Sequence, residues 1–444
     1  MTLLAMAAAL SLGDIYLQSL VPTSGAGIDA VLDGKIDTGW KPEGTPIGEG
    51  ITFRFEEPVD VKSVEVQGCA GSETAELDLV FDGFRREVTL KDGKGKTSPS
   101  FKWRTLFLKV ESGSGCIAEV NFTGLAGNVK PPRTVHGKVS VSSVLTPADA
   151  YHPGYMFDGR LDFGWVEGSK GTGEGEWLTI TLDAPATVSA LEIWNGYQRS
   201  PDHFQKNCRP KKVTLSIDGG EGIALELADR DGPQKLPLPK AVKGSAFKLT
   251  IDEVVKGSKY TDMVISEVRF HDEQGPLEID TDDVKERAAA LKTEVSGKPL
   301  EALVGARMTS VCPEGQLTVK LRSNHTFAFY EDTTRGSVSI NEVVDGAWIV
   351  KSDKAIELFG RRQKISVDDR PYGSGTRETV QITGGPVNVT RVKDLGKDAY
   401  AKLLEKWKKG PAKRHVGCAG ASFDAAGDAV VLEGVALTGL VTVR

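Results

Sequence analysis

The chain contains one kind of segment twice, and this internal repeat constrains its fold more than any other sequence feature. The stretch LDGKIDTGW at residues 32–40 recurs as FDGRLDFGW at 157–165, at a constant offset of 125 residues. After two additional residues in the second copy, the agreement continues at an offset of 127: Pro58 matches Pro185, Val61 matches Val188 and Val66 matches Ile193. Agreement that keeps its order over such a length is not expected by chance. The first half of the chain is therefore predicted to be a tandem pair of one domain type.

Alternating apolar and polar residues predict that both copies are built from β-strands. Residues 51–68 of the first copy and 177–196 of the second alternate with period two, and each stretch carries a proline between two runs. The chain also has 50 glycines, which suit short strands joined by tight turns. Strands of this length, separated by Gly and Asp turns, favour antiparallel β-sandwiches.

Beyond the repeat, the pattern predicts one helix and then further strands. Residues 280–297 begin with acidic residues and end at Gly297, as helices often do, and we interpret this helix as a connector between domains. From about residue 300 the strand pattern returns and resembles the up-and-down strands of a lipocalin-like barrel, with a basic helix at 397–410. A length of 444 residues fits about three domains.

The N-terminus and the overall charge indicate the compartment. The first residues, MTLLAMAAALSLG, form an apolar run of the length found at the centre of a signal peptide. No Lys or Arg precedes this run, so an N-terminal buried helix is the alternative interpretation. No other stretch approaches the ~20 apolar residues that cross a bilayer. A net charge of −6 does not favour a nucleic-acid binder. We therefore expect a secreted, periplasmic or cell-surface protein without an integral membrane span or a nucleic-acid partner.

Cysteine usage agrees with export. Cys69 and Cys116 both lie in the first copy, whereas Cys312 and Cys418 flank the C-terminal part. In an oxidising compartment these cysteines are expected to form two intradomain disulfides, which leaves Cys208 unpaired. The spacing does not fix the connectivity. No CxxC motif or Cys/His cluster indicates a zinc site.

Several stretches of the second copy together resemble a known family. MFDGRLDFGW, KNCRPKKVTLSIDGG and KYTDMVISEVRF follow one another within about residues 150–272. In this order they resemble the NADase-type glycan-binding domain, a discoidin-like, galactose-binding-like jelly roll named from the translocation region of a bacterial NAD-glycohydrolase toxin. The first copy, at about 28–124, resembles a degenerate discoidin-like relative. The resemblance implies a carbohydrate-binding β-sandwich with its ligand on loops at one end. It does not bring the toxin's catalytic domain, which no part of the chain matches.

The predicted architecture is mainly β, with two tandem discoidin-like jelly-roll β-sandwiches, a helical connector and a C-terminal lipocalin-like β-barrel with one helix. In order along the chain, the expected parts are a signal peptide at 1–20, the degenerate discoidin-like sandwich at 21–126, the glycan-binding-type sandwich at 135–275, the connector at 278–297 and the barrel-like domain at 298–444.

A loop in which the two copies differ carries the candidate binding residues. Residues 195–212 of the second copy replace the much shorter 68–76 of the first. The longer loop supplies one aromatic plane and several polar donors, the groups that recognise a sugar: Tyr197, Arg199, His203, Asn207 and Arg209. The alternative is a surface loop in which Arg209 pairs with an acid and Tyr197 is a buried support. Our hypothesis is that the second copy binds a glycan and the first is a spacer.

The repeated Asp-Gly stretch is interpreted as architecture. In Asp158-Gly159 the aspartate can bond to its own backbone while the glycine supplies a positive φ, as a turn requires. The rival interpretation is a structural calcium loop at Asp158, because carboxylates and loop carbonyls suit a hard cation. Trp165 and Trp177 follow turn residues and are expected to pack in the core.

The chain lacks the short motifs of several enzyme classes, although its many Asp and Glu residues leave a glycosidase pair of carboxylates open. There is no HExxH, no GxSxG elbow and no phosphate-binding glycine loop. The leading interpretation is a non-catalytic, exported glycan-binding or adhesion protein. We expect no cofactor other than the calcium considered above. The expected partners are a glycan or glycoconjugate, and envelope proteins. The alternatives are a C-terminal barrel that binds a small ligand or is enzymatic, with the sandwiches as targeting modules, and a scaffold between envelope proteins. The runs FAFY and AWIV favour a filled barrel.

Overall fold

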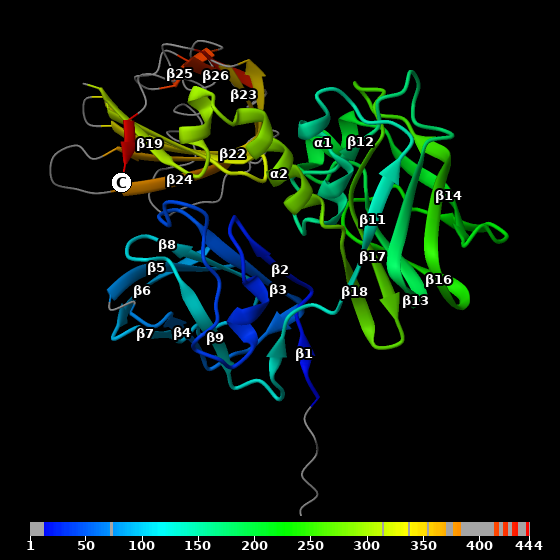
Figure 1. Cartoon of the computed structure of the whole chain (residues 1–444), viewed down its shortest axis with the longest axis horizontal. Coiled ribbons are helices and arrows are strands. Elements are labelled where there is room, and N and C mark those ends of the chain that lie inside the picture. The colour runs from blue at the N-terminus through cyan, green and yellow to red at the C-terminus, as the bar shows by residue number, and fades with distance from the viewer. Residues whose placement is uncertain are drawn as a thin grey trace, which may run out of the picture. The chain divides into compact units, whose positions relative to one another are not determined.

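A computed structural model gives the fold (Figure 1). It describes residues 13–71, 74–312, 315–335, 338–352, 355–369, 376–382, 413–416, 421–424, 429–433 and 441–443. Two compact units divide the chain, Met1–Arg133 and Thr134–Arg444. Most of the predicted signal peptide, the predicted helix at 397–410 and Cys418 lie outside the described residues. No described helix has the length and apolar character needed to span a bilayer.

The first unit is an eight-stranded antiparallel sheet in the order β2-β3-β8-β5-β6-β7-β4-β9. Its strands are β2 (Ser19–Pro22), β3 (Gly50–Val59), β4 (Ser63–Gly68), β5 (Thr74–Phe81), β6 (Phe84–Lys91), β7 (Lys94–Thr97), β8 (Trp103–Val110) and β9 (Ile117–Thr123). The 3-10 turn η1 (Ile28–Leu32) precedes β3, and β1 (Ile15–Tyr16) pairs in parallel with β10 (Val129–Lys130). Along β3, buried Ile51, Phe53 and Phe55 alternate with polar residues, so one face of the strand lies on the core.

Cys69 and Cys116 of the first unit form a disulfide, as predicted. Cys208, in the second unit, is a free, buried cysteine. Cys69 directly follows β4 and Cys116 directly precedes β9, which are neighbours in the sheet. The bond therefore joins two segments that backbone pairing already holds together.

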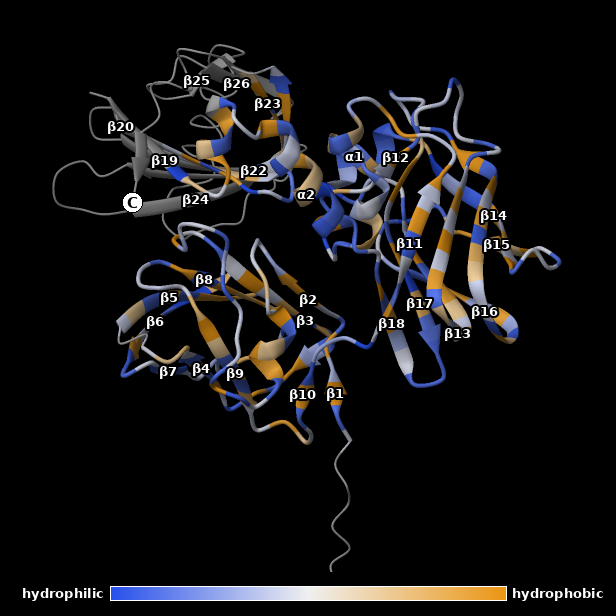
Figure 2. Cartoon of the chain, viewed as in Figure 1, coloured by the Kyte–Doolittle hydropathy of each residue, from blue (hydrophilic) through white to orange (hydrophobic). Residues whose placement is uncertain are grey.

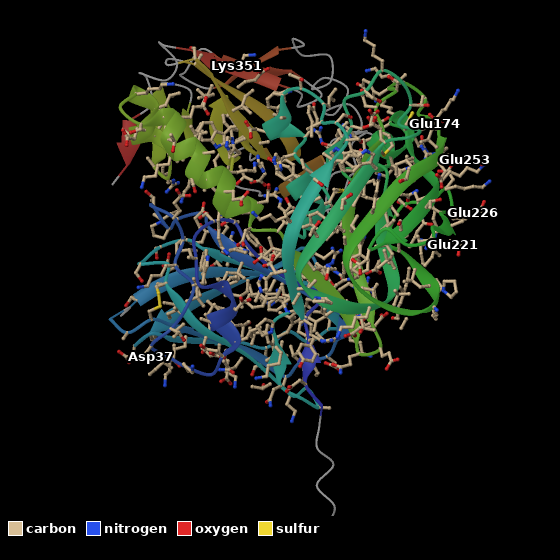
Figure 3. The ribbon with its side chains drawn as sticks, turned by 45° about the vertical axis from the view of Figure 1, so that its right-hand side comes forward. Asp37, Glu174, Glu221, Glu226, Glu253 and Lys351 are labelled. Carbon is tan, nitrogen blue, oxygen red and sulfur yellow. A yellow bond between two sulfur atoms is a disulfide. The ribbon has the colours of Figure 1, made fainter. Side chains whose placement is uncertain are left out.

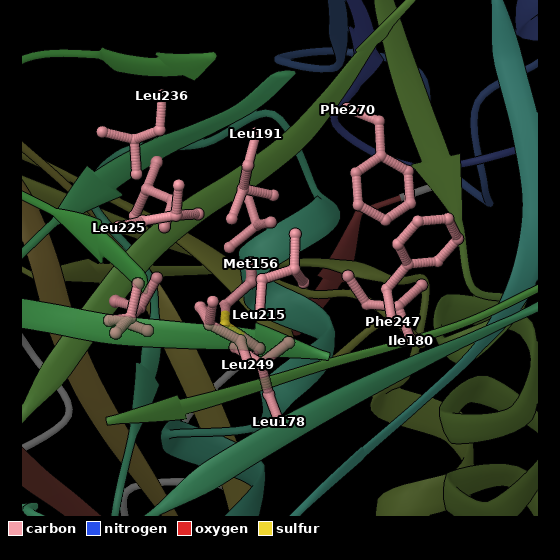
Figure 4. Close-up of a cluster of buried hydrophobic side chains, with 14 of the residues drawn as sticks. Met156, Leu178, Ile180, Leu191, Leu215, Leu225, Leu236, Phe247, Leu249 and Phe270 are labelled. Atoms are coloured by element: carbon pink, nitrogen blue, oxygen red, sulfur yellow. The ribbon is translucent and has the colours of Figure 1, made fainter. Parts of the chain in front are cut away.

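The second unit begins with one eight-stranded sheet that encloses an apolar core. Its strands are β11 (Thr134–Val141), β12 (Trp165–Val166), β13 (Trp177–Asn195), β14 (Arg209–Ile217), β15 (Ile223–Glu226), β16 (Gln234–Val255), β17 (Val264–Asp272) and β18 (Gly275–Asp280). Four of them, β11, β13, β17 and β18, pair in a closed ring. Figure 4 shows side chains of the core cluster of this sheet, among them Leu178, Leu191, Phe247 and Phe270. Figure 2 shows apolar and polar residues interspersed along the strands, as expected for strands with one face on a core.

The same sequence pattern gives different strands in the two copies. Residues 51–68 form two strands, whereas 177–195 form the single long strand β13, whose pairing shifts between Thr181 and Ala186, around Pro185. The first part of β13 pairs with β11 and the last part with β17. The strand bends at this shift, so that both of its ends lie at one end of the sandwich. At the last residue of β13, Asn195 Nδ2 donates to Pro210 O at 3.0 Å, and directly before its first residue, Glu176 O accepts from Ile251 N at 2.8 Å. The connecting segments 167–176, 196–208 and 256–263 all leave from this end, which we call the loop end.

The rest of the second unit is an antiparallel meander that follows the helix α2 in the chain and packs against it. Described pairings run in the order β24-β23-β22-β21-β20-β19-β28, with β27 also on β23 and β25 paired with β26. The elements are α2 (Asp283–Val295), η4 (Pro299–Leu303), β19 (Arg307–Cys312), β20 (Gly315–Leu321), β21 (Thr326–Arg335), β22 (Val338–Ser352), β23 (Ala355–Asp369), β24 (Thr376–Ile382), β25 (Lys413–Val416), β26 (Ala421–Asp424), β27 (Ala429–Glu433) and β28 (Val441–Val443). The up-and-down order agrees with the predicted one, while a lipocalin-like closure stays a prediction.

The helix predicted as a connector is part of this meander's core. Leu291 and Val295 of α2 pack with Trp348 of β22 in one apolar cluster. The next residue along β22, Ile349, points to the other face and packs with Tyr155 and Phe163 of the sandwich. In the described region both faces of β22 are therefore covered, one by α2 and one by the sandwich.

Candidate functional site

The loop predicted to carry the binding residues folds into a short helix. It contains α1 (Pro201–Lys206), which begins after Ser200 with Pro201 at its first position. Ser200 Oγ accepts a hydrogen bond from His203 N at 3.2 Å and lies 2.8 Å from His203 Nδ1. Serine is a favoured residue at this position because its hydroxyl satisfies a free helix N–H. The loop is thus an ordered element of the loop end.

Most of the predicted sugar-binding side chains support this loop from inside. Four of the five are buried: Tyr197, Arg199, Asn207 and Arg209. The Arg209 guanidinium lies 2.6 Å from Asp229 Oδ1, donates to Phe204 O at 3.1 Å and stacks on the Phe204 ring at 4.5 Å. Tyr197 packs in an apolar cluster with Val166 and Val264. These contacts favour the support role for the loop, while the sugar-binding role of these five residues stays a prediction.

The Asp-Gly stretch of the second copy is a turn. Asp158 Oδ1 accepts the backbone N–H of Arg160 at 2.8 Å, and Gly159 has φ 70°, a conformation that favours glycine. Burial raises the pKa of Asp158 to about 8, so its carboxyl group tends to be neutral. Among the described residues, no three His, Cys, Asp or Glu side chains are grouped as a metal site. The geometry of Asp158 therefore fits a structural turn, and a calcium ion at this residue stays a prediction.

The loop end presents one exposed aromatic ring that the candidate set did not include, that of Tyr260. Its side chain is 37% exposed, and it is the one large apolar side chain of residues 134–280 that the structure shows as exposed. Tyr260 N donates to Lys206 O at 2.8 Å, next to α1. On the other side of the same segment, Met263 N donates to Glu167 Oε1 at 3.1 Å. Tyr260 thus stands where the three connecting segments of the loop end meet.

Comparison with known proteins identifies the sandwich of the second unit. Residues 132–271 match the NAD glycohydrolase translocation F5/8 type C domain. We call these residues the F5/8 type C segment. A comparison with curated proteins gives no match.

Solved structures similar to the chain include carbohydrate-binding modules. The CBM32-1 and CBM32-2 domains of Clostridium perfringens ZmpB, in complex with GalNAc, are 8% identical, with 57% of this chain and 89% of that chain covered and a TM-score of 0.24. The family 32 module of C. perfringens NanJ, in complex with galactose, is 14% identical, with 30% and 92% covered and a TM-score of 0.24. The family 32 module of Streptococcus pneumoniae EndoD is 14% identical, with 31% and 96% covered and a TM-score of 0.26.

The free thiol of the F5/8 type C segment contacts the backbone of the turn that carries Tyr260. Cys208 Sγ accepts a hydrogen bond from Gly257 N at 3.3 Å and donates one to Tyr260 O at 3.6 Å. Its backbone N donates to Asp262 O at 3.0 Å. Burial raises the pKa of the thiol, so it keeps its proton and can donate. Cys208 therefore holds both ends of the turn that carries the exposed ring.

Each of the three segments of the loop end carries charged groups, and that of Lys259 contacts the Tyr260 ring. Lys259 Nζ lies 4.7 Å from the Tyr260 ring centroid, which is cation–π distance. On α1, Lys206 forms an ion pair with Asp202. On the segment before β13, Glu174 bonds to Thr172, and Figure 3 shows Glu174 at the end of the sandwich away from Glu221. An ammonium group therefore lies at the exposed ring, while Asp202 and Glu174, on the other two segments, have partners of their own.

The sequence contained a weak signal for Tyr260. The residue stands in the polar run KGSKYTD, directly before the apolar strand β17. A large aromatic residue inside such a polar run has no apolar neighbours along the chain to bury it. The long loop 195–212 was a candidate because it differs between the copies, but its own Arg209 and Tyr197 are buried and hold the loop together.

Proposed function

We propose that the chain is a non-catalytic carbohydrate-binding protein and that Tyr260, at the loop end of the F5/8 type C segment, is the plane on which a sugar stacks. The observation that carries the proposal is the exposure of this ring, on a residue whose backbone is fixed by hydrogen bonds of its O with Cys208 Sγ and of its N with Lys206 O. An aromatic face suits the C–H patch of a sugar ring, and an ordered backbone at this residue lowers the cost of ordering on binding. Binding there involves loops at one end of the second sandwich.

Polar groups for the sugar hydroxyls are available around the ring. Gln205, Lys259 and Thr261 are exposed next to Tyr260, on α1 and on the turn itself. Each provides a hydrogen-bond donor, and Gln205 and Thr261 also provide acceptors. A binding site needs only a few such groups to orient a ligand on an apolar plane.

The non-catalytic part of the proposal rests on two carboxylates of the loop end, Glu167 and Asp202, which have structural roles. Glu167 accepts hydrogen bonds from Met263 N and Ser169 N, while Asp202 pairs with Lys206. A glycosidase requires two carboxyl groups, about 5–10 Å apart, that face the scissile bond. Carboxylates that hold backbone segments are poorly placed for this task.

The proposed setting is extracytoplasmic, with a glycan or glycoconjugate, or envelope proteins, as partners. The Cys69–Cys116 disulfide supports this setting because such bonds persist in oxidising compartments. The alternative of a ligand-carrying or enzymatic C-terminal domain gains no support from the described part of the meander, where β22 is packed on both faces.

A glycan array with the full chain tests the proposal. We expect the wild type to bind a defined set of glycans and Tyr260→Ala to lose them, while keeping its far-UV spectrum and unfolding midpoint. Tyr16→Ala is the matched control, because Tyr16 is an exposed tyrosine, at 45%, in the first unit. The proposal is wrong if the wild type binds no glycan, or if Tyr260→Ala binds the same glycans as strongly.

A further inference from the structure

The ammonium group of Lys259 lies over the Tyr260 ring, on which the proposed function places a sugar. Its Nζ lies 4.7 Å from the Tyr260 centroid, and both side chains are exposed at the loop end. From this pairing we propose that the site selects acidic sugars, those carrying a carboxylate, over their neutral counterparts. The inference rests on the proposed function, because it concerns the same ring.

The selection follows from what happens to the ammonium group when a sugar arrives. A sugar that stacks on Tyr260 displaces Lys259 from the ring face and forfeits the cation–π attraction, which is modest at an exposed site. A neutral sugar offers the displaced ammonium only hydroxyl groups. A carboxylate offers it a charge-assisted hydrogen bond, which is roughly twice as strong as a neutral one. The acidic sugar therefore recovers what the neutral sugar loses.

The charges around the ring are compatible with an anionic ligand. The turn 256–262 contains two lysines, Lys256 and Lys259, and one acid, Asp262, whose side chain is half-buried. The nearest acid on α1, Asp202, is paired with Lys206. A carboxylate on the ligand thus meets an exposed ammonium group at Tyr260 and a carboxylate of α1 that is already neutralised. Because these groups are exposed, we expect the preference to be several-fold rather than absolute and to weaken in salt.

Pairs of glycosides that differ only at C6 test the inference with the full chain. The probes are methyl galactoside with methyl galacturonide, and methyl glucoside with methyl glucuronide. Each is titrated by saturation-transfer NMR at low salt and again at about 0.5 M salt, where charges are screened over a shorter distance. We expect the wild type to bind the acidic member of at least one pair several-fold more tightly. Lys259→Gln keeps a hydrogen-bond donor for a sugar hydroxyl but removes the charge, so it should weaken the acidic sugar far more than the neutral one and thereby remove this preference. Lys243→Gln, an exposed lysine on β16 outside the loop end, should behave as the wild type.

The outcomes separate this inference from the proposed function. If Tyr260→Ala loses both members of a pair while Lys259→Gln keeps the wild-type preference, the sugar site stands and the inference about Lys259 is overturned. A Lys259→Gln variant that loses both sugars equally also overturns it. If Tyr260→Ala binds both sugars as the wild type does, the proposed site itself is wrong. Failure of the wild type to bind any of the four glycosides overturns the inference.

Discussion

Glu119 Oε2 accepts the backbone N–H of Gly34 at 3.0 Å, and the same relationship exists in the second copy between Glu267 and Gly159. Gly34 and Gly159 are the glycines of the repeated Asp-Gly turn. In each copy a carboxyl group from the last third of the repeat therefore holds the turn in place. Burial raises the pKa of both carboxyl groups, to about 7 for Glu119. A protonated or half-protonated acid is a tolerable partner inside such a turn because it carries little charge.

The raised pKa of Glu119 predicts how the stability of the first unit changes with pH. In the unfolded chain this group titrates near its ordinary value of 4.5, and in the folded unit near 7, so the unfolded chain loses the proton first. The stability is therefore full below about pH 4.5 and falls as the pH rises toward 7. We expect Glu119→Gln, which keeps an acceptor for Gly34 N, to be more stable than the wild type at pH 8 by about 1 kcal/mol, a value discounted for solvent screening.

Hydrogen exchange of the slowest amides in β3 and β8, at pH 5 and pH 8, measures this difference in the intact chain. Glu87→Gln is the control because the Glu87 side chain is 78% exposed. An equal response of the two variants to pH would show that the Glu119 carboxyl is not the group responsible.

Much of the architecture could be predicted from the repeat. Trp40 and Trp165 are equivalent in sequence, and both are buried with Nε1 donating to a backbone carbonyl at 2.8 Å, of Ser24 and of Ser143 respectively. A large ring at a repeated position directly after a turn is informative because a core has few places for it. The alternation that predicted strands at 51–68 and 177–196 likewise reflects a local property of the chain.

The candidate site was harder to predict because burial of polar loop residues depends on distant partners. The pairing of Arg209 with Asp229 joins residues 20 positions apart, and nothing in the local pattern fixes it. The helix 283–295 is a different case: Arg287, Leu291 and Val295 are its buried residues and lie four apart. That spacing marks one helix face and could have indicated packing, whereas the interpretation as a connector used only the acidic start of the helix, its end at Gly297 and its place between the predicted domains.

The Cys208 thiol, which contacts the turn that carries Tyr260, predicts a difference between two small substitutions. Cys208→Ala removes both hydrogen bonds to the turn, whereas Cys208→Ser keeps a donor and an acceptor at the same place. We expect Cys208→Ala to speed exchange of the Gly257 amide, to weaken glycan binding several-fold and to cost about 1 kcal/mol, and Cys208→Ser to restore most of the binding. If serine restores stability without binding, or neither variant changes the Gly257 amide, then the thiol does not position the ring.

Breaking the Arg209–Asp229 pair is expected to lower the stability of the loop and to leave ligand binding unchanged. Asp229→Ala leaves the guanidinium, which is 6% exposed, without its carboxylate, although the Phe204 carbonyl remains. We expect faster exchange of the amides at 201–209, corresponding to about 1–2 kcal/mol. Asp231→Ala is the matched control, because this exposed acid lies in the same turn. Loss of glycan binding in Asp229→Ala with unchanged exchange would instead return the binding role to this loop.

The packing of α2 predicts that this helix is required for the stability of the meander. Leu291 is buried against the cluster that contains Trp348, so Leu291→Ala should cost about 2–4 kcal/mol through lost burial and the cavity left behind. Val284→Ala, in the same helix but at a side chain that is 50% exposed, should stay within about 0.5 kcal/mol. Exchange of the Trp348 amide, which donates to His325 O at 2.8 Å, reports the effect inside the sheet. A connector that merely links two domains would leave this amide unchanged in both variants, and that result would contradict the role assigned to α2.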